Sequence, residues 1–393
     1  MLVKRVVVEK ANRLYQLPPE VDSLLRLARK RERSHARKGD LIDLATFKWP
    51  VSELDLAGDR ANFAPANLTE LMRLKSLAAD WVEKRTGAKV DPDKEVFIGA
   101  GISQMSILLS LAFIDHGDVG FVPELGLPLY RRAIAACGGE AVSYGVNGRD
   151  SWSIGMDRLN TGLGRVARLM FINSPHNPTG MTVADAELDE LVWMAGRSHV
   201  ALVNDAAYAD LCDPRIPSLL SATGARKVGV ELYSFAYNLG LPGVPLGFMA
   251  GQRDIISGVK QAARLLPPYL PSSLVDAAGR AIAGYPISTL IAARDAVEKA
   301  RTALLPLLEG LHVQPASAPT IPFVWARVDS RTDANRSVDR FYRRWRIQAI
   351  PGTVFGDIGE QYVRFSLTVT PETIEQARAR LSRRPARRKR KPS

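Results

Sequence analysis

The chain has 393 residues, of which 46% are hydrophobic, and a formal net charge of +12. This length favours two domains over a single core, and the composition is typical of a soluble α/β enzyme. No stretch approaches the roughly 18 consecutive apolar residues of a membrane span, and the first residues show no signal-peptide core. The only two cysteines, Cys137 and Cys212, fit a reducing cytoplasm and exclude a disulfide framework or a cysteine zinc site.

Short apolar runs alternate with helical patterns through the middle of the chain, which predicts βα units and a largely parallel sheet. Three prolines follow residue 266, after which a helical period returns over residues 273–308. Residues 320–381 read as two or three strands followed by a helix over 371–381. The strands predicted before that point are 96–98, 119–122, 168–172, 200–204, 229–235 and 246–250, and the helices are 102–113, 184–195 and 255–266.

These elements predict an α/β protein with a large domain, whose mainly parallel sheet is flanked by helices, and a smaller α+β domain. We assign residues 1–50 to an N-terminal arm and part of the small domain, 51–275 to the large domain, and 276–382 to the small C-terminal domain. Residues 383–393 carry seven positive charges and no acid. We expect them to be a disordered basic tail, and we expect neither a nucleic acid nor a membrane as a partner.

The most specific motif is Phe171–Gly180, which reads Phe-Ile-Asn-Ser-Pro-His-Asn-Pro-Thr-Gly. It follows a predicted strand, and its prolines and glycine define a turn that would present Asn177 to a cleft. Asp205 and Tyr208 follow the next predicted strand. Parallel sheets place ligands beyond the carboxyl ends of their strands, so these side chains are expected to share one site. An ordinary turn and a helix cap are the structural alternatives.

Two further motifs frame this predicted site. Gly99–Gln104 lies between a predicted strand and a helix, where backbone N–H groups favour a phosphate. Arg364, in Tyr362–Ser366, has the forked guanidinium that suits a carboxylate, although a strand arginine in a salt bridge is the alternative. None of the five histidines has metal-ligand spacing, so no metal site is expected.

In order and spacing, these motifs resemble those of the class I/II aminotransferases, which have the fold type I of enzymes that depend on pyridoxal phosphate (PLP). The resemblance covers roughly residues 12–382. It implies that PLP, or a PLP–amino acid adduct, binds in the cleft, that the substrate is an amino acid or keto acid with a carboxylate, and that the protein is a cytoplasmic homodimer. The resemblance implies that Asn177 and Tyr208 donate hydrogen bonds to the phenolic oxygen of PLP and that Asp205 pairs with its pyridine nitrogen. It implies that Arg364 binds the substrate carboxylate. It also implies that the phosphate contacts come from Gly101, Ile102, Ser103 and Ser234.

The chain departs from the family where the cofactor would be held. Residues 234–247 match the family's Schiff-base segment without a gap, yet Tyr237 stands at the lysine and Pro245 at the arginine that grips the phosphate. Leu127 replaces the aromatic that stacks on the pyridine ring, and Phe63 replaces a tyrosine that reaches a phosphate across the dimer. Any cofactor would therefore be bound without a covalent link at residue 237, and non-covalently unless another lysine takes that role.

Tyr237 is the predicted catalytic residue, as an acid or base. A phenol with a pKa near 10 costs about 4 kcal/mol to ionise at pH 7 unless its site lowers that value. Lys48 lies in a loop that borders the substrate site in the family, which makes it a predicted substrate-binding residue; an exposed loop lysine is the alternative. The substrate itself is not encoded in a recognisable motif.

Three functions are compatible with this pattern. The first is an aminotransferase-like protein repurposed to bind or convert an amino-acid-like ligand without a Schiff-base lysine. The second is a conventional PLP-dependent aminotransferase that uses another lysine, such as Lys48 or Lys260. The third is a non-catalytic partner subunit of the same fold.

Overall fold

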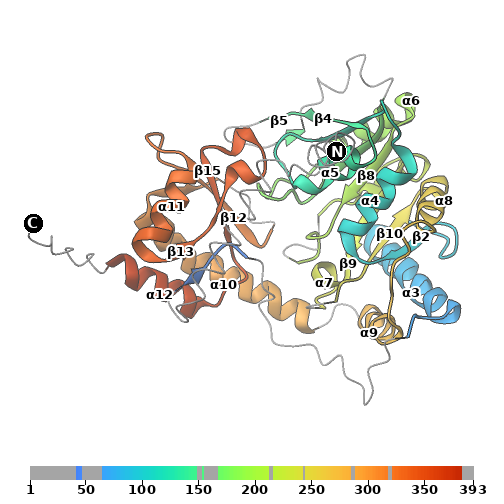
Figure 1. Ribbon diagram of the computed structural model, residues 1–393. Coiled ribbons are helices and arrows are strands. Elements are labelled where there is room, and N and C mark those ends of the chain that lie inside the picture. Colours follow the sequence, from blue (N-terminus) through green and yellow to red (C-terminus); the bar gives the residue numbers. More distant parts are fainter. Residues whose placement is uncertain are drawn as a thin grey trace, which may run out of the picture.

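The computed structural model describes residues 41–46, 64–147, 153–154, 167–211, 216–241, 244–284, 288–316 and 321–382. Two layered units, each built on its own sheet, lie side by side in Figure 1. Lys48, Phe63 and the basic tail 383–393 lie outside the described residues, so the predictions made for them are not addressed by the structure.

The larger unit is built on a seven-stranded sheet. Five neighbouring strands run parallel, whereas β10 pairs antiparallel with both of its neighbours. The predicted α/β class with a mainly parallel sheet is therefore confirmed. In spatial order the strands are β2 (Val96–Gly99), β10 (Gly247–Gly251), β9 (Gly229–Ser234), β8 (Ala201–Asp205), β7 (Ala167–Asn173), β3 (Val119–Pro123) and β4 (Glu140–Tyr144).

Helices cover both faces of this sheet because its central strands are apolar on both sides. In β7, Leu169 and Phe171 pack into one core, and Met170 and Ile172 pack into another. The first face carries α4 (Gly101–Phe113), α5 (Pro128–Ala136) and α8 (Arg253–Ala262). The second face carries α3 (Leu68–Thr86), α6 (Asp185–Ser198) and α9 (Ser272–Ala283).

Helix α3 shows how local sequence sets an element that the periodicity argument did not single out. Asn67 and Glu70 form a capping box, in which each side chain accepts a hydrogen bond from the other's backbone N–H, at 3.0 and 2.7 Å. The helix ends at Gly87, whose φ of 75° is left-handed. Both signals are readable in the sequence.

The smaller unit has a four-stranded sheet in the order β11 (Val313–Pro315), β12 (Phe323–Val328), β15 (Tyr362–Ser366) and β14 (Ile350–Pro351). Near it, β1 (Ile42–Asp43) pairs in parallel with β13 (Ile347–Gln348), so a segment from the start of the chain joins this unit. The covering helices are α10 (Ser288–Leu311), α11 (Ala334–Trp345) and α12 (Pro371–Ser382). The remaining short strands, β5 (Val146–Asn147) and β6 (Ser153–Ile154), form a separate pair.

Some predicted elements were wrong in extent. The helical period predicted over residues 273–308 is confirmed and corresponds to two helices, α9 and α10. Helix α11 interrupts what was predicted as strands alone; its buried residues Ala334, Val338 and Phe341 recur at helical spacing. The predicted strand 229–235 ends at Ser234, because Phe235 begins the short helix α7 (Phe235–Asn238).

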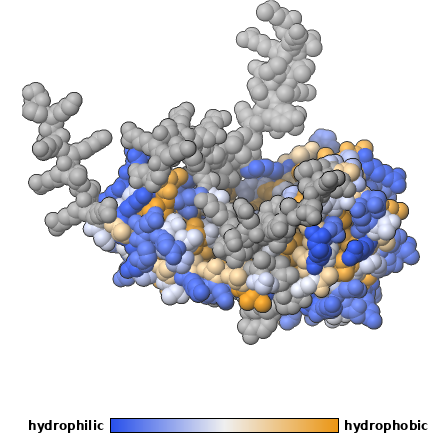
Figure 2. Space-filling view, turned by 90° about the horizontal axis from the view of Figure 1, so that it is seen from below, coloured by the Kyte–Doolittle hydropathy of each residue, from blue (hydrophilic) through white to orange (hydrophobic). Residues whose placement is uncertain are grey.

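Hydrophilic residues cover most of the described surface on the face in Figure 2, with smaller apolar patches between them. Elsewhere in the fold, the segments 64–68 and 265–271 lie side by side, joined by a 2.8 Å hydrogen bond from the Ala66 N–H to the Leu270 carbonyl. These two segments carry four exposed large apolar side chains: Leu68, Leu265, Leu266 and Tyr269, which are 75%, 82%, 42% and 61% exposed.

Candidate functional site

The predicted site residues follow neighbouring strands at one edge of the large sheet. Asn173, the last residue of β7, holds two of these segments together. Its side-chain amide donates to the Asp205 carbonyl at 2.7 Å, and its side-chain oxygen accepts the Asn177 N–H at 2.8 Å. The turn after β7 is thereby fixed beside the end of β8, as the parallel topology requires.

Asn177 joins the two units of the protein. Its side-chain oxygen accepts a 2.8 Å hydrogen bond from Arg364 on β15, although the two residues are 187 positions apart in the chain. Its amide donates weakly, at 3.5 Å, to the hydroxyl of Tyr208. The structure therefore brings together three residues that the sequence could place only at separate strand ends.

Arg364 is a buried cation held by aromatic rings. It is 7% exposed, and its guanidinium carbon lies 4.0 Å from the ring centre of Phe323 and 4.9 Å from that of Phe355. Its buried Nε has no hydrogen-bond partner among the described residues. Burial lowers the pKa of Arg364 to about 10, opposed by Tyr208 and Tyr237. The arginine is still charged at neutral pH. No ion pair to it is present among the described residues, so a bound carboxylate would supply a counter-charge.

Asp205 is fixed by an interaction that the sequence analysis did not anticipate. The Tyr130 hydroxyl on α5 donates to one carboxylate oxygen at 2.5 Å, and the Ala207 N–H donates to the other at 3.1 Å. Burial raises the pKa of Asp205 to about 6, against these two hydrogen bonds, which lower it. A cation facing this carboxylate would favour its ionised form.

Tyr237 lies on α7 with its ring beside that of Tyr208; the ring centres are 5.1 Å apart. Both rings pack in a cluster with Phe323 from the small unit. Burial and the nearby Asp205 raise the pKa of Tyr237, and Arg364 only partly opposes them. The phenol is therefore neutral at physiological pH, which suits a hydrogen-bond or proton donor and not a ready base.

Hydrogen bonds of the Asn238 side chain hold the turn that carries Tyr237 in place. Its side-chain oxygen accepts the Ser234 N–H at 2.7 Å, and its amide donates to the Ala206 carbonyl at 2.8 Å and to Asp210 at 2.9 Å. Arg85 on α3 in turn donates from Nε to both Asp210 oxygens at 3.1 Å. One buried network thus fixes the β9–α7 turn against the segment after β8.

The predicted phosphate loop has only some of the groups that would bind a phosphate. Gly101 has a φ of 81° and begins α4, but the side chain of Gln104 already accepts the Ala100 N–H at 2.8 Å. Ile102 is half-buried against the core, and the Ser103 side chain is exposed. Ser234, 5% exposed, pairs with Gly247 at the end of β9. Pro245 is exposed, and its carbonyl is 3.8 Å from the position that a Cβ of Gly101 would occupy.

Lys260, one of the alternative Schiff-base lysines, lies elsewhere. Its ammonium donates to the backbone carbonyl of Asp93. It lines a separate pocket with Lys75, Asp93 and Phe97, among others. None of the residues linked above to Asn177, Asp205 or Arg364 lines that pocket.

Several site residues escaped the sequence reasoning. Tyr130 could have been suspected, since it stands three positions after Leu127, the residue predicted to replace the family's stacking aromatic. No sequence pattern identified Phe323 and Phe355, because their contacts with Arg364 depend on how the small unit is folded and packed. The same holds for the network of Arg85, Asp210 and Asn238.

Part of this site fits PLP and part does not. Asp205, Asn177 and Tyr208 could meet the ring edge, and the unpartnered guanidinium of Arg364 could meet a carboxylate. No amine occupies the position of Tyr237, and Pro245 offers no cation to a phosphate.

Among the described residues, no helix is long and apolar enough to cross a membrane. Within the same residues, no group of three or more potential ligands could hold a metal ion.

The chain is similar in sequence to curated aminotransferases. An LL-diaminopimelate aminotransferase from Halothermothrix orenii is 26% identical over 392 residues, covering 95% of this chain and 98% of the relative. The enzyme of that name from Syntrophobacter fumaroxidans is 28% identical over 396 residues, with 95% and 98% coverage.

Solved structures show the same fold. Substrate-bound BacF from Bacillus subtilis superposes with a TM-score of 0.83 at 23% identity, covering 94% of this chain and 96% of that one. A probable N-succinyldiaminopimelate aminotransferase from Thermus thermophilus gives a TM-score of 0.81 at 22% identity, with 91% and 98% coverage. The family described as aminotransferase class I and II matches residues 51–381, and the chain belongs to that family.

Proposed function

We propose that this protein binds an amino-acid-like ligand together with PLP, or as a PLP–amino acid adduct, without a covalent link between PLP and a lysine. The observation that carries the proposal is Arg364, a buried guanidinium between two aromatic rings whose Nε lacks a partner among the described residues. Leaving a buried donor unsatisfied costs free energy that a bound carboxylate would recover.

The ring of the cofactor would meet Asp205, Asn177 and Tyr208, as in the family. When bound, PLP supplies an electron sink for the α-carbon of an amino acid. Asp205 would hold the ring nitrogen, Asn177 would orient both the ring edge and Arg364, and the neutral phenol of Tyr237 would donate a hydrogen bond or a proton at the position of the family's lysine.

A binding and reduction experiment tests this proposal. The purified protein is treated with PLP and borohydride and then weighed by mass spectrometry; no lysine–PLP mass is expected. In parallel, Nα-phosphopyridoxyl-norleucine, a stable compound that joins the cofactor to an amino acid, is titrated by calorimetry. Binding that is lost in Arg364→Met supports the proposal. A reducible lysine–PLP adduct would instead support a conventional aminotransferase that uses another lysine.

We also propose that the protein is a homodimer. The adjacent segments 64–68 and 265–271 carry the exposed Leu68, Leu265, Leu266 and Tyr269, and contiguous exposed apolar side chains are typical of association surfaces. The same surface would serve a non-catalytic subunit that pairs with a related chain. Sedimentation of the wild type and of Leu265→Glu separates these cases from a monomer, since only a dimer through this surface would dissociate in the variant.

A further inference from the structure

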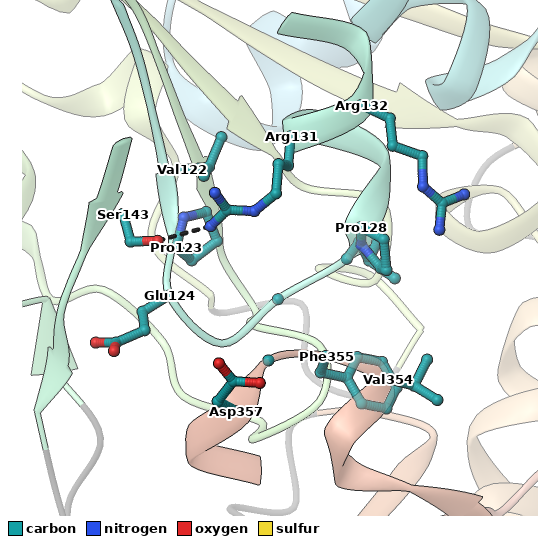
Figure 3. Close-up of a pocket in the computed structure, with 13 residues that line it drawn as sticks. Val122, Pro123, Glu124, Pro128, Arg131, Arg132, Ser143, Val354, Phe355 and Asp357 are labelled. Carbon is teal, nitrogen blue, oxygen red and sulfur yellow. Dashed lines mark hydrogen bonds between the residues drawn. The ribbon is translucent and has the colours of Figure 1, made fainter. Parts of the chain in front are cut away.

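Two regions outside the candidate site carry concentrated charge. The first is a cavity of about 350 Å³, where the loop from β3 into α5 meets the segment between β14 and β15 (Figure 3). Phe355 and Arg131 line it together with the carboxylates of Glu124 and Asp357. Arg131 already donates to the Ser143 hydroxyl at 2.6 Å. Because both signs of charge share one space, this cavity does not favour a ligand of either sign.

The second region is helix α11, whose side toward solvent is basic. Its other side, which includes Val338 and Phe341, is buried in the core of the small unit. The basic side has arginines at positions i, i+4, i+7 and i+8, which share one face of a helix about 12 Å long. These exposed residues are Arg336, Arg340, Arg343 and Arg344. Arg346 follows directly after the helix, and we call these five arginines the basic face.

Acidic side chains neutralise only part of the basic face. Arg336 pairs with Asp333 at 3.2 Å, and Arg343 pairs with Asp339 at 2.6 Å. The arginines of this face that form no ion pair among the described residues are Arg340, Arg344 and Arg346. A surface with such an excess of one sign attracts ligands of the opposite sign, and several cations in a row favour a ligand with several anionic groups.

Aromatic rings support the guanidinium groups that have no acidic partner. The pairs and the distances from guanidinium carbon to ring centre are Arg344 with Trp345 (4.9 Å), Arg346 with Tyr342 (5.3 Å) and Arg340 with Phe341 (5.7 Å). Arg340 and Arg344 are exposed, so a planar group from solvent would stack on the side away from the ring. Unstacked nucleic-acid bases use arginine planes in this way.

The buried side of α11 separates a nucleic acid from a membrane as the partner. A basic helix that lies on a membrane inserts its apolar side among the lipids. In α11, Phe341 is 0% and Val338 is 6% exposed, so this side is already occupied by the core. A single nucleic-acid strand needs cations for its phosphates and flat groups for its bases. The basic face offers both.

The last helix of the protein lies beside α11 (Figure 1). Arg380 on α12 donates to the Trp345 carbonyl at the end of α11, at 3.3 Å. Residues 383–393, which follow α12, carry seven positive charges and no acid. The tail alone did not predict a nucleic acid as a partner, whereas a folded basic face at the same end of the small unit does.

We propose that the basic face of α11 binds single-stranded nucleic acid. Its arginines would contact the phosphates, and the guanidinium planes of Arg340 and Arg344 would stack on bases. This inference goes beyond the proposed function and does not depend on it, because α11 carries none of the residues of the candidate site.

Binding of labelled oligonucleotides to the full-length protein tests the proposal. Oligothymidylate and oligouridylate of about 20 nucleotides exceed one ordinary binding site, and fluorescence anisotropy measures their affinities. Arg340→Gln with Arg344→Gln and Arg346→Gln is expected to weaken both at least about tenfold. The slope of log affinity against log salt should become shallower by about 2, since each lost phosphate contact accounts for about 0.7.

A matched variant removes the same net charge from other helices. Arg73→Gln with Arg197→Gln and Arg253→Gln changes exposed residues of α3, α6 and α8 and should bind both oligonucleotides nearly as the wild type does. A second basic-face variant, Arg340→Lys with Arg344→Lys, keeps the charge and removes the planes. It should weaken the single strands and not a DNA duplex, whose bases are already stacked.

Three results would overturn the proposal. Equal weakening in the two triple variants would show that net charge alone attracts the strand. Affinities of the lysine variant that equal those of the wild type would remove the stacking role. Binding to vesicles that contain phosphatidylserine, lost in the basic-face triple variant while neither oligonucleotide binds, would identify a membrane as the partner. Unchanged urea unfolding and unchanged binding of phosphopyridoxyl-norleucine verify that each variant is folded.

Discussion

The two sides of the candidate site differ in how completely they are built. On the side of the small unit, Arg364, Asn177 and Tyr208 are buried, joined by hydrogen bonds and packed among aromatic rings. On the side of α4, the predicted phosphate loop has an exposed Ser103, and Pro245 is exposed at the position predicted to match the family's arginine. A chain that was losing a cofactor site without replacement would not be expected to keep a costly buried cation on the other side. The difference is the one expected if carboxylate recognition is the retained property, as we propose.

Removing the cation should have the largest effect. Arg364→Met is expected to weaken binding of phosphopyridoxyl-norleucine by about 3–5 kcal/mol, because a bidentate carboxylate loses two charge-assisted hydrogen bonds. The free protein should be unchanged or more stable by up to about 3 kcal/mol, since a pKa held near 10 means that burial of the charge opposes folding. Calorimetry and urea unfolding measure the two quantities.

Arg364→Lys is the control for this experiment, since it keeps the charge and loses the forked geometry. A Met variant that binds as the wild type does, or that unfolds more than about 1 kcal/mol more easily, would contradict the view that Arg364 is kept for a ligand at a cost in stability.

Restoring a cation to the predicted phosphate loop should strengthen binding of PLP on the side of α4. Pro245→Arg is expected to strengthen binding of PLP by about 1.5–3 kcal/mol, because it returns a charge-assisted contact to the phosphate loop beside Gly101. In Tyr237→Lys with Pro245→Arg, borohydride should now trap PLP on the new lysine. Absorbance titration and mass spectrometry measure both effects. If neither variant gains affinity, the loop at the start of α4 is not a phosphate site.

The buried carboxylate should make stability depend on pH. Burial raises the pKa of Asp205 from its usual 3.8 to about 6, so its contribution to stability is present below the lower value and lost as pH rises through the upper one. Relative to Asp205→Asn, the wild type should therefore lose about 2 kcal/mol of unfolding free energy between about pH 4.5 and 7.5. Urea unfolding at both pH values measures this; a difference that does not change with pH would show that the carboxylate is not perturbed. Glu190→Gln, on exposed α6, is the control.

The smallest effect is expected where the lysine would be. Tyr237→Phe keeps the ring beside Tyr208 and should change the unfolding free energy by less than about 1 kcal/mol. If Tyr237 is the proton donor, the variant should bind phosphopyridoxyl-norleucine normally and lose any turnover of amino acids with added PLP. Turnover that survives in Tyr237→Phe would remove this residue from the chemistry.

Much of the fold could be predicted from local sequence. The βα pattern gave the mainly parallel sheet, and the strand ends correctly located the segments of Asn177 and Asp205, because parallel strands end at one edge. Helix α11 was missed, since apolar spacing alone does not separate a short amphipathic helix from strands. The domain boundaries and the roles of the site residues remain predictions.

The sequence by itself determined the family, because membership depends only on residue identity within ordered motifs. It also predicts that Tyr237 and Pro245 stand at the family's lysine and arginine. Only the tertiary structure decided which residues contact one another in the candidate site. Contacts between distant segments place Arg364 against Phe323 and Phe355 and join it to Asn177 by a hydrogen bond. Such contacts also bring Tyr130 to Asp205 and form the cavity with charges of both signs beside Phe355. The physical reason is that the pKa of a buried charged group depends on the groups packed around it, as does the free energy that it gains from a partner. The packing of the two units against each other determines which groups those are.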